Sequence, residues 1–155
     1  MTPANERVAR AWAARGVEIA VQQFPASTRT AQDAASALGC DVAQIAKSLV
    51  FQCKRDAQPM LVIASGRNRV NTSQLDSDLG LTLVKASADD VRRWTGHAIG
   101  GVPPHSEGPP MRTVIDETLL EFDRVWAAAG TPNTVFAVSP ADLVRVTGGT
   151  VRSVI

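Results

Sequence analysis

Lys47 is the residue whose type and position most directly suggest chemistry. It opens the segment KSLVF, and the alternation of side chains along a strand places it on the same face as Leu49 and Phe51. A lysine on an apolar face is unusual, because its ammonium group is almost never fully buried without a partner. One interpretation is that Lys47 lies at the strand end and extends this group to solvent. The other is that the cation projects into a pocket, where it binds an anion or polarises an ester carbonyl.

A loop rich in glycine and proline is the second candidate feature. The segment Ala98–Pro110 reads AIGGVPPHSEGPP. Gly100 and Gly101 permit a close approach of the backbone to a ligand, and prolines such as Pro104 restrict that backbone. The loop could therefore donate N–H groups to a carbonyl or a ribose, with His105 at the pocket rim. The alternative is a tight turn that joins two strands.

Two strand ends provide further candidates. Asp116 ends the apolar segment TVID and precedes a helical stretch, so its simplest role is to cap that stretch. It could instead accept a hydrogen bond from a substrate amine or hold Lys47 in position. Ser65 and Gly66 follow the apolar run MLVIA, where they form either the edge of a site or an ordinary strand end before a turn.

The motifs of several enzyme classes are missing from the sequence. Neither His97 nor His105 has a metal-ligand spacing, and no glycine-rich nucleotide-binding motif is present. Cys40 and Cys53 form no CxxC pair and are predicted to be reduced thiols, and no Ser-His-Asp elbow is visible. We therefore predict no metal and no cofactor.

Hydrophobic periodicity and capping residues predict a mixed α/β (α+β) fold, with a mostly antiparallel sheet of about seven strands and four or five short helices. Thr30 and Asp33 have the spacing of a capping box, with Gly39 as the stop of that helix. The other predicted helices are Asn5–Ala14, Thr72–Leu79, Ser87–Trp94 and Pro140–Val146. The predicted strands are Val17–Phe24, Lys47–Cys53, Met60–Ser65, Leu81–Val84, Thr113–Ile115, Val125–Ala128 and Thr134–Val138.

Length and composition are those of one globular domain, predicted to span residues 1–155. The net charge is +1, from 16 Lys and Arg against 15 Asp and Glu, which excludes a strong field for holding a long duplex. Local contact with the end of a nucleic acid remains open. No secretory or membrane-spanning apolar run is present, so we expect a soluble protein of the cytoplasm.

Five segments, in this order and spacing, resemble the YbaK/ProX-type aminoacyl-tRNA deacylases, a family related to the editing domain inserted in bacterial prolyl-tRNA synthetases. The resemblance covers nearly the whole chain. The segments are RTAQDAASALGCDVAQIAKSLVF (29–51), LVIASGRNRVN (61–71), GHAIGGVPP (96–104), TVIDETLL (113–120) and VWAAAGTPNTVF (125–136).

The resemblance implies a YbaK-like fold and a site centred on the lysine of the K-S/T-L strand. It places the G-G-x-x-P loop across from that lysine, and the threonine- and alanine-rich helix beside it. With the candidates above, the predicted catalytic residue is Lys47. The predicted substrate-binding residues are Thr30, Ala31, Ala34, Ser48, Ser65, Gly66, Gly100, Gly101, Pro104, His105 and Asp116.

The implied activity is hydrolysis, in trans, of the ester between a wrong amino acid and tRNA. To hydrolyse such an ester, an enzyme mainly needs to orient it and to stabilise the oxyanion that forms. Water, or the neighbouring ribose hydroxyl acting through water, is the expected nucleophile. A cysteinyl substrate could use its own thiol. The RTAQDAA segment looks more like that of the family members that act on alanine, or a similarly small residue, on tRNA for proline than like that of the cysteinyl type, and this resemblance implies such a substrate. The chain departs from many relatives at PPHSEGPP, which changes the pocket rim and leaves its preference open.

Two other functions compete with this prediction. The pocket could belong to a non-catalytic module that binds an aminoacyl group or the end of a tRNA, although such a module would not need Lys47. It could also belong to an esterase for small aminoacyl compounds. The expected partners are the acceptor end of aminoacyl-tRNA, with Arg67 and Arg69 either on its phosphates or in a solvated turn, and prolyl-tRNA synthetase as a further candidate. No membrane partner is expected.

Overall fold

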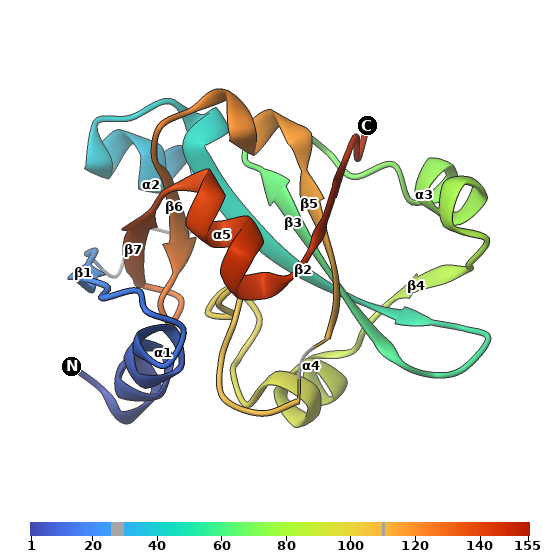
Figure 1. Ribbon diagram of the computed structural model, residues 1–155, viewed down its shortest axis with the longest axis horizontal. Coiled ribbons are helices and arrows are strands. Elements are labelled where there is room, and N and C mark those ends of the chain that lie inside the picture. The colour runs from blue at the N-terminus through green and yellow to red at the C-terminus, as the bar shows by residue number, and fades with distance from the viewer. Residues whose placement is uncertain (26–29, 110) are drawn as a thin grey trace.

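The computed structural model describes residues 1–25, 30–109 and 111–155, which form an eight-stranded mixed sheet with five α-helices around it (Figure 1). Arg29, the first residue of the RTAQDAA segment, and Pro110, the last of the glycine–proline loop, lie outside the described residues. The helices are α1 (Pro3–Ala13), α2 (Ala31–Leu38), α3 (Thr72–Leu79), α4 (Ala88–Thr95) and α5 (Pro140–Thr147), with short 3-10 helices η1 (Val42–Gln44) and η2 (Glu117–Glu121). The strands are β1 (Gln22–Gln23), β2 (Ile45–Cys53), β3 (Pro59–Ser65), β4 (Leu83–Lys85), β5 (Arg112–Asp116), β6 (Val125–Ala128), β7 (Thr134–Val138) and β8 (Thr150–Arg152).

Strand β2 is the centre of the sheet, whose order is β1-β7-β6-β2-β3-β5-β8 with β4 also paired to β2. One edge of β2 pairs antiparallel with β3 along its length. The other edge pairs with β6 only through Ile45–Ala46 and with β4 only through Phe51–Cys53. Within the described residues, Lys47 to Val50 therefore have no strand partner on that edge.

The predicted fold class is confirmed. Among the described strands, four pairings are antiparallel and three are parallel. The helix Thr72–Leu79 and the strands Val125–Ala128 and Thr134–Val138 have the predicted bounds. Thr30 accepts a hydrogen bond from the main-chain N–H of Asp33, and the Asp33 side chain accepts one from Thr30, which confirms the capping box of α2.

Two strand predictions are corrected. The segment Val17–Phe24 pairs with another strand only at Gln22–Gln23. The side chains of Val17, Ile19 and Val21 pack against the core although their backbone forms no strand pairing, and this burial produces the alternating pattern. An eighth strand, β8, was not predicted. Its three residues are too few to produce a pattern, and its parallel pairing with β5 is a tertiary contact.

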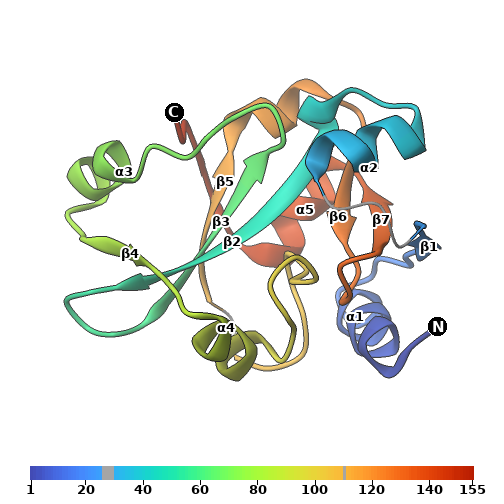
Figure 2. The same ribbon diagram turned by 180° about the vertical axis from the view of Figure 1, so that it is seen from behind.

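Helices cover both faces of the sheet. Helix α5 lies in front of the sheet in Figure 1, and α2 lies in front in the reverse view (Figure 2). This arrangement explains the continuously apolar sequence of β3, since Leu61 and Ile63 pack in one core cluster while Met60 and Val62 pack in another. In the described part of the chain, no helix has the length and apolar character needed to cross a bilayer.

Candidate functional site

Lys47 lies on β2 between two hollows, and its ammonium group is partly buried. Its Nζ donates a hydrogen bond of 3.0 Å to the main-chain oxygen of Asn68, in the turn after β3. Cross-strand pairing places Lys47 opposite Ala64, on the face that also carries Leu49 and Phe51. The lysine is thus held by the protein and is not simply extended to solvent.

The two hollows meet along β2 and share Lys47, Ser48, Leu49, Ile99 and Val102. The first, which we name the α2 hollow, has a volume of about 270 Å³. The second, the α4 hollow, has a volume of about 420 Å³. The α2 hollow is further lined by Phe24, Thr30, Ala31, Ala34, Gly100 and Trp126, among others. The α4 hollow is further lined by Phe51, Arg69, Val70, Lys85 and Val91, among others.

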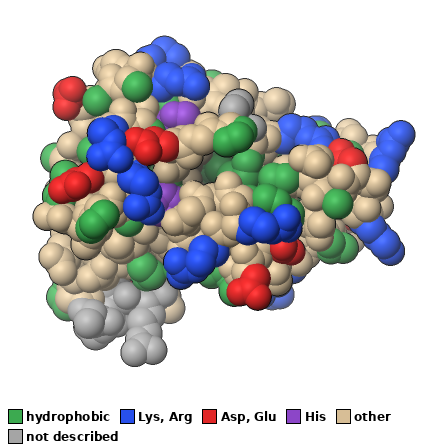
Figure 3. All heavy atoms as spheres, turned by 90° about the horizontal axis from the view of Figure 1, so that it is seen from below, with side chains coloured by type: hydrophobic (Ala, Val, Ile, Leu, Met, Phe, Trp, Pro, Cys, Tyr) green, Lys and Arg blue, Asp and Glu red, His purple; other side chains and the backbone are tan. Residues whose placement is uncertain are grey.

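The two hollows around Lys47 are lined mostly by apolar side chains, together with the positive charges of Lys47, Arg69 and Lys85. They suit a ligand that combines an apolar part with negative charge. On the face that carries α1 and α4, Figure 3 shows hydrophobic side chains in a hollow near the middle, with lysine and arginine side chains around it.

The open edge of β2 presents main-chain groups to the hollows. The N–H of Gly66 donates to Ile45 O on the β3 side, and that of Ala86 donates to Val50 O on the other side. Because these groups alternate along a strand, the N–H and C=O of Ser48 face the open edge. The Ser48 hydroxyl is buried and has no hydrogen-bond partner among the described residues. An unsatisfied buried polar group costs about 1–3 kcal/mol, so this position favours a ligand or water.

A buried network fixes the turn that holds Lys47. The Asp116 carboxylate is 1% exposed and accepts hydrogen bonds from the N–H groups of Ser65 and Thr118 and from the Asn68 side chain, at 2.9, 3.0 and 2.9 Å. Asn68 also donates to the Thr118 hydroxyl at 2.9 Å. The predicted capping role of Asp116 at η2 is confirmed. Asp116 thereby positions the main-chain oxygen of Asn68 that receives Lys47.

Burial lowers the pKa of Lys47 below its ordinary value, and the nearby charge of Asp116 opposes that shift. The two arginines of the GRNRVN turn have different surroundings. Arg67 forms an ion pair with Glu121 at 3.5 Å, whereas Arg69 lines the α4 hollow. The positive charge beside the α4 hollow therefore comes from Lys47, Arg69 and Lys85.

Six of the predicted site residues do not line the hollows around Lys47: Asp116, described above, Pro104 and His105, described below, and Ser65, Gly66 and Gly101. Ser65 is fully buried, and its hydroxyl donates to Ala43 O at 2.7 Å. Gly66 packs against the Val42 carbonyl, where no side chain would fit. Gly101 donates its N–H to Ala98 O at 2.9 Å and packs against the Thr131 backbone. Ser65, Gly66 and Gly101 hold the walls of the site in position.

Gly101→Ala is expected to lower the free energy of unfolding by about 1–3 kcal/mol, the usual range for overpacking. An added Cβ would lie 2.8 Å from the Thr131 Cα, and main-chain atoms cannot rotate away as a side chain can. Urea unfolding of this variant, beside the exposed control Ser77→Ala, measures the effect. Equal unfolding midpoints for the two variants would contradict the close packing described here.

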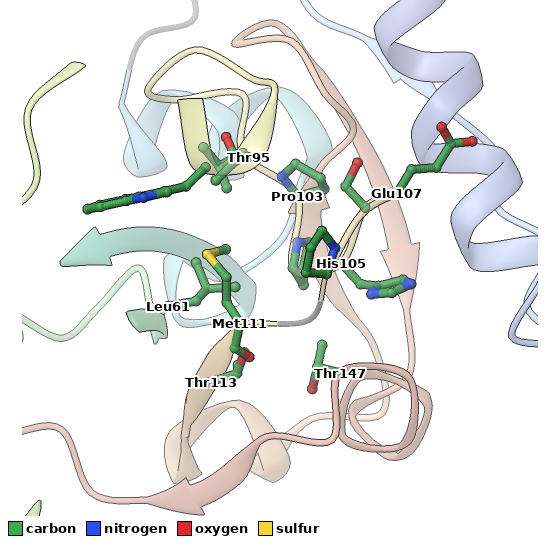
Figure 4. A pocket seen from close by; sticks show the side chains of 13 residues that line it. Leu61, Thr95, Pro103, His105, Glu107, Met111, Thr113 and Thr147 are labelled. Carbon is green, nitrogen blue, oxygen red and sulfur yellow. The ribbon is translucent and has the colours of Figure 1, made fainter. Parts of the chain in front are cut away.

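Pro104 and His105 line a separate small hollow of about 40 Å³ (Figure 4). Figure 4 shows His105, Leu61 and Met111 around this space. The His105 main-chain oxygen accepts a hydrogen bond from the Trp12 indole at 3.0 Å, and the two rings meet edge to face. The structure thus brings together Lys47, Ser48, Gly100 and the α2 residues, and places Pro104 and His105 elsewhere.

The family to which the chain belongs is decided by comparison with known proteins. The model of the aminoacyl-tRNA editing domain matches residues 25–146. The chain belongs to this family.

Relatives of this editing-domain protein agree with the assignment. A solved structure described as a candidate trans-editing enzyme for prolyl tRNA synthetase is 41% identical, with a TM-score of 0.93 over 99% of this chain and 97% of the other. The uncharacterised protein YwhH of Bacillus subtilis is 31% identical over 79% of this chain and 78% of its own length. A proline–tRNA ligase of Limosilactobacillus fermentum is 34% identical over 48% of this chain but only 14% of the ligase.

Several residues of this editing-domain site were not predicted from the sequence. Asn68 was the most important, since its role depends on its main-chain oxygen as well as its side chain. The turn composition GRN after a buried strand was the available signal for it. Ile99 was also missed, although its side chain is 55% exposed between the two hollows, an unusual position for isoleucine. Among the described residues, no group of three or more His, Cys, Asp or Glu side chains is placed to hold a metal ion.

Proposed function

We propose that this editing-domain protein hydrolyses the ester bond of mischarged aminoacyl-tRNA in trans, and that its substrate is tRNA for proline carrying alanine or another small amino acid. The observation that carries the proposal is the position of Lys47, held by Asn68 at the junction of two hollows. The family match and the relative described as a candidate trans-editing enzyme support it.

The two hollows suit the two parts of such a substrate. The α2 hollow is smaller, and Ala31, Ala34 and Thr30 form a wall that suits a small aminoacyl group. The α4 hollow is larger and carries Arg69 and Lys85, which suit the terminal adenosine and its phosphate. The ester that joins these two parts would then lie at Lys47 and Ser48, which both hollows share.

The chemistry follows from these positions. Water attacks the ester carbonyl carbon, the bond from that carbon to the ribose oxygen breaks, and the ribose oxygen takes a proton derived from the water. The Lys47 ammonium group and the Ser48 N–H stabilise the negative charge that develops on the carbonyl oxygen. Binding in two hollows orients the ester, so the reaction requires no nucleophile from the protein.

The substrate is tested by deacylation time courses on tRNA for proline charged separately with alanine, cysteine, serine and proline. We expect fast release of alanine or of one other small non-cognate residue, and no release of proline above spontaneous hydrolysis. One methylene changes binding by only about 1–3 kcal/mol, so discrimination among the small residues will be partial. Absence of release from all four would refute the proposed activity and favour a non-catalytic binding module.

Salt dependence separates this activity from that of an esterase for small aminoacyl compounds. Contacts with tRNA phosphates weaken as the salt concentration rises, whereas hydrolysis of a small aminoacyl ester has no such contacts to lose. We therefore expect kcat/KM for aminoacyl-tRNA to fall with salt while that for an aminoacyl methyl ester stays level.

A further inference from the structure

His97 and Ser106 form a hydrogen-bonded pair outside the two hollows around Lys47. The His97 ring is 2% exposed, with Nδ1 3.2 Å from the Gly130 main-chain oxygen and Nε2 2.9 Å from the Ser106 hydroxyl. A carbonyl oxygen can only accept, so Nδ1 carries the hydrogen. In the neutral ring Nε2 then has a free electron pair, and the Ser106 hydroxyl donates to it.

The surroundings of His97 favour this neutral form. Burial lowers the pKa of His97, the hydrogen bond to Gly130 opposes the shift, and the positive charges of Arg7 and Arg92 add to the lowering. The Ser106 hydroxyl, the His97 ring and the Gly130 carbonyl are thus connected by two hydrogen bonds. Serine hydrolases connect a hydroxyl, a base and a group that orients the base in the same order. A main-chain carbonyl takes the place of the usual carboxylate.

Ser106 also borders a cavity. It lines the small hollow of Figure 4, whose walls include Leu61, Pro103, Pro104 and Met111. The volume is about 40 Å³, and a water molecule needs about 10–15 Å³ of such space. The hollow therefore suits an acyl group of only a few atoms. On its rim, Glu107 is engaged with Arg10 in an ion pair of 2.9 Å.

We propose that Ser106 is a second reactive centre, which accepts small acyl groups from activated carboxylic esters with His97 as the base. The Ser106 oxygen attacks the carbonyl carbon while its proton passes to His97 Nε2. The bond from that carbon to the leaving oxygen breaks, and the leaving oxygen takes the proton from Nε2. The products are an acyl ester of Ser106 and a free alcohol, and water then releases the carboxylic acid. Neither Lys47 nor tRNA takes part in these steps.

Acetylation by p-nitrophenyl acetate tests the proposal, with peptide mapping by mass spectrometry to locate the acetyl group. We expect one acetyl group on Ser106, formed about 100-fold faster than on the exposed Ser77, because general-base assistance contributes about 10²–10⁴-fold. Ser106→Ala should lose that acetyl group, whereas Ser77→Ala and Lys47→Ala should keep it.

Ser106→Ala should also leave hydrolysis of aminoacyl-tRNA unchanged, which separates this proposal from the proposed function. Acetylation of other residues alone would show that the pair only anchors the loop and would overturn the proposal.

The pH dependence of labelling provides a second test that does not require replacing the buried His97. Protonation occupies Nε2, so His97 can no longer take the serine proton. The acetylation rate of Ser106 should therefore fall as pH drops through the lowered pKa of His97 and reach a plateau above it. A rate that instead rises in proportion to hydroxide over the whole range would overturn the role of His97.

Discussion

Lys47→Ala is expected to lower kcat/KM for hydrolysis of alanyl-tRNA for proline by about 10²–10³-fold, the usual loss when one donor to a developing oxyanion is removed. The structure supports an effect of this size because Lys47 is the cation at the junction of the α2 and α4 hollows. The matched control is Lys54→Ala, which removes an exposed lysine from the β2–β3 turn. Single-turnover rates at saturating enzyme measure the chemical step, and thermal unfolding checks that both variants are folded. An unchanged single-turnover rate in Lys47→Ala would remove this residue from the mechanism.

Arginine at this position separates the two roles open to Lys47. A cation that stabilises the oxyanion loses its charge as pH rises through its pKa, which burial lowers. The wild-type rate, corrected for spontaneous hydrolysis, should therefore fall at high pH. Lys47→Arg keeps its charge throughout and should retain part of the activity without that fall. A wild-type rate that rises through the Lys47 pKa, together with an inactive Lys47→Arg, would instead identify Lys47 as a base.

The fold was predictable to the extent that local patterns determine it. The capping box at Thr30 and Asp33 defines α2 through interactions within four residues, and such interactions can be recognised in the sequence. The continuously apolar sequence of β3 is typical of a strand covered on both faces, and its side chains pack in two core clusters. The segment Val17–Phe24 has the same alternating pattern as a strand but lacks a neighbour to pair with along most of its length. Pairing is a tertiary property, so the pattern alone could not distinguish these two cases.

The residues of the candidate site also fall into those that the sequence order predicts and those that depend on tertiary structure. Lys47, Thr30 and Ala34 line one hollow because a helix and a strand that follow each other in sequence pack together, as the motif order implied. Pro104 and His105 follow Gly100 closely in sequence but lie in another hollow, since the chain turns away from β2 after Val102. Asn68 acts largely through its main-chain oxygen, a group that every residue has. The composition GRN therefore indicates the turn after β3, but residue type gives no signal for the main-chain bond that holds Lys47.

Asn68→Ala is expected to lower kcat by roughly tenfold or more while KM changes little, because a misplacement of about 1 Å at a reacting group can cost up to about 10²-fold. The substitution keeps the main-chain oxygen that accepts from Lys47. It removes the two side-chain hydrogen bonds, to Asp116 and Thr118, that fix that oxygen in place. A fall in kcat with a melting temperature close to wild type would show that Asn68 positions Lys47. Equal losses of activity and stability would indicate only a structural role.

Asp116→Asn provides the larger stability effect from the same network. The amide is nearly the same size as the carboxylate, and its oxygen can still accept from Ser65 and Asn68, but its NH2 group then faces the Thr118 N–H that the second carboxylate oxygen accepts at 3.0 Å. One buried donor would then face another, so we expect a loss of about 1–3 kcal/mol in the free energy of unfolding. The matched control, Asp123→Asn, changes an exposed carboxylate near the end of η2 and should alter stability by less than about 0.5 kcal/mol. Urea unfolding measures both variants. If Asp116→Asn were as stable as its control, the buried carboxylate could not be what holds the Asn68 turn against β2.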